Sequence, residues 1–190
     1  MPGAPATVKV VGVTTETWEQ FQDFFSSKGC PGFCWCAAYR FFDAPKMSRD
    51  QKKSAMHRRV KRGVPVGVVA LRDEQAVGWC SIAPRASMER LQTSKYMPVV
   101  NDKACTLLCL FVRRADRGEG LGHALIEGAL RYARKHRVRE VEAYPWDTAG
   151  MRKNAKGDDP SMHFGHSAMF KACGFEREGR TRRWVKKLRA

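Results

Sequence analysis

The clearest change of hydrophobic pattern in this chain falls between residues 105 and 137. Thr106 to Val112 is a short run of apolar and β-favouring residues, which is typical of a buried strand and too short for a helix. A charged segment, 113–117, follows, and glycine then occupies every second position from 118 to 122. From Leu121 onward the apolar residues recur every three or four positions, as in an amphipathic helix. The pattern therefore predicts a strand, a glycine-rich turn and a helix.

The same kinds of pattern predict the rest of the chain. Further strands are expected at residues 7–13, 66–72, 77–82, 140–146, 175–181 and 183–188. Helices are expected after Thr14 or Thr15, from the capping box at Ser48 to about Arg62, and within 161–173. Residues 86–103 should cross irregularly, and the charged, turn-rich 147–160 should form a mobile loop. The predicted order is β-α-α-β-β-β-α-β-α-β-β in one domain, residues 1–190.

The glycine-rich turn has a chemical use at the start of a helix. The first backbone N–H groups of a helix have no partner within it, and glycines let an anion approach them closely. The letters fit neither a dinucleotide-binding G-x-G-x-x-G, because the third position is His123, nor a P-loop, because no Lys follows Gly122. They fit R-x-x-G-x-G, read as Arg117-Gly118-Glu119-Gly120-Leu121-Gly122. A glycine-rich connection without a ligand is the simpler alternative.

This motif, five residues after the end of its strand, resembles the acetyl-coenzyme A signature of the GNAT acyltransferase superfamily. The predicted order of elements resembles the whole GNAT fold, an α/β (α+β) fold with a central mixed, mostly antiparallel sheet flanked by helices. The resemblance implies an N-acetyltransferase that moves an acetyl group from acetyl-CoA to a primary amine by direct attack in a ternary complex. It also implies which residues contact the cofactor: Leu110, Phe111, Val112, Arg117, Gly118, Glu119, Gly120, Leu121, Gly122, His123, His163 and Phe170.

The catalytic residues are where the chain departs from the superfamily. Many members take a proton donor from a Tyr four residues before a closing Gly-Phe, and this chain has Phe170 there. Many use a Glu on the organising strand as the base, and Thr106 to Val112 contains no acidic residue. Glu142, Tyr144 and His166 are the candidates for the missing acid and base, and a surface ion pair is the alternative role for Glu142.

An aromatic, cysteine-rich segment, 30–42, reads CPGFCWCAAYRFF. By its position after the first helix it resembles the superfamily's acceptor-binding region, which makes Phe33, Trp35 and Tyr39 candidate substrate contacts, together with Trp79. The spacing C-x3-C-x-C could supply soft metal ligands, but no second pair completes a zinc site. We therefore expect no metal, and we expect these aromatic residues to form core or line a pocket.

The net charge of +16 makes the surface attractive to anions. Basic residues gather in 46–62 and in the tail after Arg177. They suit coenzyme A, an acidic protein or RNA, but aromatic residues do not interleave with them, so nucleic acid is not the favoured partner. A small-molecule amine is the favoured acceptor, and the oligomeric state stays open, a homodimer included.

The sequence also bears on location. No apolar run is long enough to span a bilayer, and the first residues, MPGAPATVKVV, lack the pattern of a signal peptide. A cytoplasmic protein is therefore expected, with its seven cysteines reduced.

Overall fold

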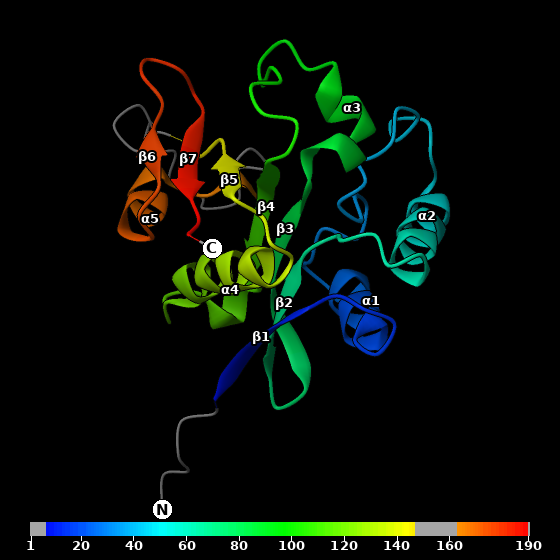
Figure 1. Cartoon of the computed structure of the whole chain (residues 1–190). Helices are drawn as coiled ribbons and strands as arrows, with labels where there is room; N and C mark the ends of the chain where they lie inside the picture. The colour runs from blue at the N-terminus through cyan, green and yellow to red at the C-terminus, as the bar shows by residue number, and fades with distance from the viewer. Residues whose placement is uncertain (1–6, 147–162, 190) are drawn as a thin grey trace, which may run out of the picture.

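The computed structural model describes residues 7–146 and 163–189. Its single sheet contains seven strands in the order β1-β2-β3-β4-β5-β7-β6 (Figure 1). Only β4 and β5 pair in parallel; the other pairs are antiparallel. The strands are β1 Val8–Gly12, β2 Val68–Arg72, β3 Gln75–Pro84, β4 Cys105–Val112, β5 Glu140–Ala143, β6 Glu176–Arg177 and β7 Trp184–Lys187. The predicted fold class is confirmed.

Within the described residues, five α-helices connect these strands: α1 Trp18–Ser26, α2 Arg49–Lys61, α3 Glu89–Gln92, α4 Leu121–Lys135 and α5 Ser167–Ala172. The capping box at the start of α2 is present, with the Ser48 amide donating to Gln51 Oε1 at 2.7 Å and the Gln51 amide to Ser48 Oγ at 3.2 Å. Residues 86–103, predicted to be irregular, contain the short helix α3. The predicted loop 147–160 lies outside the described residues.

The first helix starts later than the sequence pattern predicted. Thr17 is its N-cap, and the Thr17 hydroxyl donates to the carbonyl of Gly12 and accepts from the Thr14 amide, both at 2.9 Å. These bonds hold residues 14–17 in a turn that ends β1, so Thr14 and Thr15 cannot cap the helix. Side chain-to-backbone bonds of this kind compete with helix formation.

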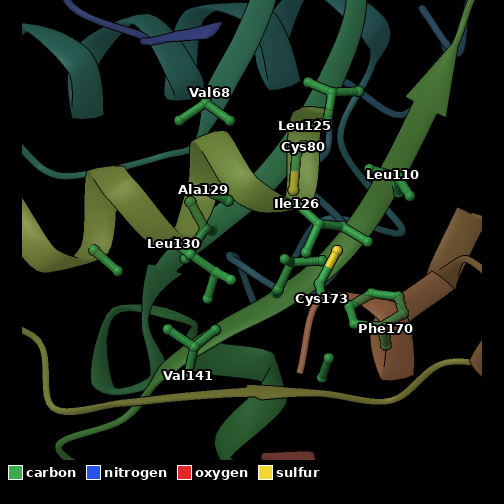
Figure 2. Packing of buried hydrophobic residues seen from close by; sticks show 14 of the residues in the cluster. Val68, Cys80, Leu110, Leu125, Ile126, Ala129, Leu130, Val141, Phe170 and Cys173 are labelled. Atoms are coloured by element: carbon green, nitrogen blue, oxygen red, sulfur yellow. The ribbon is translucent and has the colours of Figure 1, made fainter. Parts of the chain in front are cut away.

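Helix α4 covers one face of the sheet and builds the larger part of the core (Figure 1). Its side chains Leu125, Ile126, Ala129 and Leu130 pack with residues of β2, β3, β4, β5 and α5, as Figure 2 shows. At Gly128 an added Cβ would lie 2.2 Å from a Val10 methyl group, so glycine lets α4 approach β1. A second cluster, rich in aromatic residues, packs α1 and α2 against the other face. The two faces together fix the position of β4, whose end carries the predicted motif.

The sheet opens at the end of β4. Parallel pairing with β5 stops at Leu107 and Ala143, although β4 continues to Val112. The register between β3 and β4 also shifts. Cys80 pairs with Leu110 and Ile82 pairs with Leu107, so a stretch of two residues along β3 is matched by three residues along β4. A bulge of this kind bends a strand and re-aims its side chains, and bulges are common beside active sites. The last five residues of β4 therefore face an opening rather than β5.

Candidate functional site

A cavity of about 860 Å³ lies in this opening. One wall is the end of β4 and the glycine turn before α4, and the opposite wall comes from the segment around His163 to Met169. The predicted cofactor residues that line it are Leu110, Phe111, Val112, Arg117, Gly118, Gly120, Leu121, Gly122, His123 and His163. Its volume is in the usual range for small-molecule sites. The structure thus gathers most of the predicted cofactor residues around one space.

The glycine turn presents bare backbone to this cavity. Gly118 and Gly120 have φ values of 90° and 77°, a left-handed conformation that favours glycine, and a Cβ at either would meet nothing within 4 Å. Gly120 is the N-cap of α4, whose first turn contains no acidic residue. The positive end of a 15-residue helix therefore faces the cavity without a compensating side chain. This arrangement suits a phosphate or pyrophosphate group.

Ion pairs hold the turn in place. Arg72 of β2 donates to Asp116 Oδ1 at 2.9 Å and also pairs with Glu119, while Arg113 Nε binds Asp116 Oδ2 at 2.8 Å. The side chain of Glu119 thus points to Arg72 rather than into the cavity, so only its backbone could contact a cofactor. A carboxylate that would repel an anion is neutralised by the same contact.

Arg117 is one of the residues that line the cavity. Its Nε donates to the carbonyl of Val112 at 3.1 Å, and its guanidinium lies 5.7 Å from the centre of the Phe111 ring. The side chain is therefore folded back over the end of β4 and presents its charge beside the glycine turn. An arginine in this position can bind a phosphate with two parallel hydrogen bonds.

The opposite wall comes close to β4 because it contains a glycine. Gly165 has a φ of 72°, and a Cβ there would lie 3.0 Å from the Phe170 ring and 3.3 Å from a Leu110 methyl group. Phe170 itself is completely buried and packs edge-on against Phe175, so it supports this wall from the core and does not line the cavity. No local sequence pattern marks Gly165, since its role depends on contacts distant in sequence.

Comparison with known proteins shows to which protein family the chain with this arrangement belongs. A model of the acetyltransferase (GNAT) family matches residues 18–152, which include the glycine turn and the opening. The chain belongs to the GNAT acetyltransferase family. The predicted family and enzyme class are thereby confirmed: the protein is an acetyl-CoA-dependent N-acetyltransferase. No curated protein matches it in sequence.

Solved GNAT structures resemble the chain in fold at low sequence identity. The YhbS N-acetyltransferase from Escherichia coli, in complex with CoA, is 16% identical, with a TM-score of 0.52 over 98% of this chain and 84% of that one. A ribosomal-protein-alanine N-acetyltransferase from Brucella melitensis is 18% identical, with a TM-score of 0.53 over 95% and 99%. The aminoglycoside N-acetyltransferase AAC(6')-Iy, in complex with CoA, is 15% identical, with a TM-score of 0.56 over 95% of each chain.

Within this GNAT enzyme, Glu142 lies away from any solvent. Its side chain is fully buried, and its Oε1 accepts from Arg85 Nη1 at 2.5 Å and from the Thr106 hydroxyl at 2.7 Å. Its Oε2 accepts from Arg183 Nε at 2.7 Å. Both oxygens are thus occupied by cations, which keep the carboxylate out of reach of an amine. The geometry contradicts the predicted role of base, and sequence spacing gave no sign of these three partners.

Tyr144 lies beside this network but reaches a second cavity. Its hydroxyl accepts from Arg85 Nη1 at 3.2 Å, and the residue lines a space of about 670 Å³. Burial, followed by the nearby charge of Glu142, raises the pKa of Tyr144 to about 12. The phenol therefore keeps its proton at neutral pH, so it can donate a proton but is a poor base.

His166, the third catalytic candidate, lines the first cavity in this GNAT enzyme. Its Nδ1 is buried, and no residue in the described part of the chain gives it a hydrogen-bond partner. The ring of His163, from the same wall, lies 5.7 Å from that of Phe111. A buried, unpartnered ring nitrogen is unusual in a folded protein. Of the three candidates, His166 is the one that lines the cofactor cavity.

Of the four residues predicted to contact the acceptor, two line a cavity and two lie in the hydrophobic core. Tyr39 lines the second cavity, and Phe33 lines the first. Trp35 and Trp79 are almost completely buried, in ring contact with Phe25 and Phe21, and line neither cavity. These two tryptophans are therefore core residues, because α1 places its aromatic face against them.

The described residues also bear on metal binding and on membrane contact. Residues 7–146 and 163–189 contain no group of three or more His, Cys, Asp or Glu side chains arranged to hold a metal ion. The seven cysteines are free thiols. In the same ranges every helix is too short or too polar to cross a lipid bilayer.

Proposed function

We propose that this enzyme acetylates the primary amine of a small molecule, by direct attack on acetyl-CoA in a ternary complex. The observation that carries the proposal is that the glycine turn and the unpaired end of β4 open into the same cavity. The turn offers backbone N–H groups to the pyrophosphate, and the strand offers backbone groups along the pantetheine arm. Acetyl-CoA supplies the activated acetyl group; the protein's part is to hold it and to place the amine.

The end of β4 can also stabilise the charge that forms on the acetyl carbonyl. Pairing with β5 stops at Leu107, so the amides of residues 108–112 that point away from β3 are available to an oxygen atom. Fixed donors in an enclosed site are worth more than donors in water, because they do not reorient as the charge develops. One of Leu110, Phe111 or Val112 thus acts through its backbone amide, whatever its side chain.

The second cavity is the best candidate for the acceptor. It shares the 163–166 segment with the cofactor cavity, since Phe164 lines one and His163 and Gly165 line the other. Its walls contain the aromatic rings of Tyr39, Tyr144 and Trp146. Arg90 and Arg182 also line it, and both charges act on Tyr39. We infer an acceptor that carries an anionic group in addition to its amine.

A matched panel of amines tests this acceptor. We expect thiol release from acetyl-CoA with an aromatic amino acid to exceed that with its amide by at least about tenfold in kcat/KM, since a charge-assisted hydrogen bond is worth about 1.5–3 kcal/mol. Arg182→Gln should remove most of that preference while leaving activity on the amide. Equal rates for acid and amide would exclude anion recognition. If the enzyme acetylated only a protein or RNA and none of the small amines, the acceptor site would instead lie on the basic face of α2.

Arg117→Ala should weaken the cofactor much more than the acceptor. Arg117 lies beside the glycine turn and over Phe111, so its loss removes a charged contact to the pyrophosphate. We expect the KM for acetyl-CoA to rise by about tenfold or more, on the scale of 1.5–3 kcal/mol for such a contact. Steady-state kinetics with each substrate varied in turn makes the measurement. A selective rise in the acceptor KM would show that Arg117 belongs to the other site.

His166→Ala should lower kcat more than any change at the other catalytic candidates. The amine must lose a proton before or during attack, and a positioned base typically contributes a hundredfold or more. We therefore expect kcat to fall by about a hundredfold. Tyr144→Phe should lower kcat by a smaller factor, because a thiolate leaves readily without an acid. His163→Ala, on the same wall, is the control and should act mainly on the KM for acetyl-CoA. Full activity in His166→Ala would exclude it as the base.

A further inference from the structure

A buried arginine in the aromatic, cysteine-rich segment has no part in the acyl-transfer site. Arg40 is only 1% exposed. Its Nη1 donates to the Cys36 carbonyl at 2.9 Å and lies 3.4 Å from the Cys36 sulfur, and its Nη2 donates to the Ser81 hydroxyl at 2.9 Å and to the carbonyl of Val66. No carboxylate in the described part of the chain forms an ion pair with it.

The charge of Arg40 requires compensation. A guanidinium stays protonated in proteins, and a buried charge without a counter-charge is strongly destabilising. Of the groups that contact it, the carbonyls and the Ser81 hydroxyl cannot ionise, whereas the Cys36 thiol can. The geometry therefore pairs the guanidinium with a thiolate at Cys36.

A second thiol supports that thiolate. Cys36 and Cys109 pack against the same buried cluster. A hydrogen bond from the Cys109 side chain, with the charge of Arg40, lowers the pKa of Cys36 against the effect of burial. The same bond raises the pKa of Cys109 well above its usual range, so Cys109 holds the shared proton. The other thiols that act on this group, Cys34 and Cys80, have pKa values raised chiefly by burial and are neutral.

We propose that Cys36 and Cys109 form a peroxide-oxidised dithiol, in which Cys36 is the attacking sulfur and Cys109 the resolving one. The Cys36 thiolate attacks one oxygen of hydrogen peroxide, the O–O bond breaks, and sulfenic acid and hydroxide form; the hydroxide takes up the proton that the Cys36 thiol released to solvent when it ionised. The Cys109 sulfur then attacks the sulfenic sulfur, and its proton leaves with the hydroxyl group as water. Two thiols are oxidised to one disulfide, and one peroxide is reduced to two waters.

The positions of the two cysteines suit this chemistry. Both residues are partly exposed, and hydrogen peroxide is a small oxidant. Cys36 and its neighbour Trp35 have φ values of 50° and 47°, a conformation that is costly for residues other than glycine and that occurs at functional sites. Cys109 lies at the β4 bulge, next to Leu110. A disulfide would therefore tie the segment that carries Phe33 of the cofactor cavity to β4.

Thiol mapping of the whole protein tests the proposal. One equivalent of hydrogen peroxide should reduce the intact mass by two hydrogens, and peptide mapping should show the Cys36–Cys109 bond. In Cys109→Ser, dimedone should label Cys36; in Cys36→Ser, neither the bond nor a dimedone adduct at Cys109 should form. Cys34→Ser, two residues away from Cys36, is the control and should oxidise as the wild type does.

A second measurement covers variants that fail to fold. With iodoacetamide at about pH 6, Cys36 of the wild-type protein should be alkylated at least about tenfold faster than Cys34, because the thiolate is the nucleophile even though a low pKa reduces its intrinsic reactivity. Equal alkylation rates for Cys36 and Cys34, or a disulfide that links other cysteines, would overturn the proposal. Neither measurement uses acyl transfer, so its outcome is independent of the proposed acceptor and base.

Discussion

Glu142→Gln is expected to destabilise the fold strongly rather than to act on chemistry alone. The carboxylate is the shared counter-charge of Arg85 and Arg183, and all three side chains are buried. Removing one member of a buried ion pair leaves an uncompensated charge and costs about 3–5 kcal/mol. For a domain of this size we expect Tm to fall by roughly 10 °C, measured by calorimetry or circular dichroism.

Glu178→Gln is the matched control. Glu178 also pairs with Arg183, at 3.0 Å, but half of its side chain is exposed. A partly exposed pair of this kind contributes about 1 kcal/mol or less, so Tm should change little. If Glu142→Gln kept wild-type stability and lost turnover, the carboxylate would have the catalytic role that its burial argues against, and His166 would not be the base.

Gly120→Glu should abolish acetyl-CoA binding in a protein that still folds. The Cβ of the added side chain would meet nothing within 4 Å at the N-cap of α4, and the carboxylate places a negative charge where the pyrophosphate should lie. Losing charge-assisted bonds worth about 1.5–3 kcal/mol, with repulsion added, should reduce affinity by at least about a hundredfold. Calorimetric titration with acetyl-CoA measures it.

Two further glycine variants separate charge from backbone strain. Gly120→Ala strains the same left-handed residue, at φ 77°, without adding charge, and should lose much less affinity. Gly63→Glu adds the same side chain at a similar φ of 70°, also in open space, at the end of α2. It should bind acetyl-CoA as the wild type does. Undiminished binding by Gly120→Glu would place the cofactor elsewhere than at this turn.

Local patterns determined the framework of this protein. The change of period at Leu121, the capping box at Ser48 and the alternating runs each depend on neighbours within a few residues, so the sequence alone predicted the strand, turn and helix and the order of elements. The R-x-x-G-x-G motif predicted the turn that faces the cavity for the same local reason, because its glycines allow the left-handed backbone conformation that the turn adopts. Trp35 and Trp79 show the limit: an aromatic residue suits a pocket wall and a core equally well, and only the packing of α1 decided between them.

Contacts between distant segments decided the chemistry. Glu142 met the pattern of a base, and only the sheet brought Arg85 and Arg183 to it, from 57 and 41 residues away. Gly165 matters because Leu110 lies opposite, and the Cys36 sulfur matters because Arg40 is buried beside it with Cys109. Whether a side chain is charged, neutral or reachable depends on desolvation and on partners that assemble only on folding. The sequence by itself therefore determined which backbone the protein has and where an anion can bind, and the tertiary structure decided which side chains are free to react.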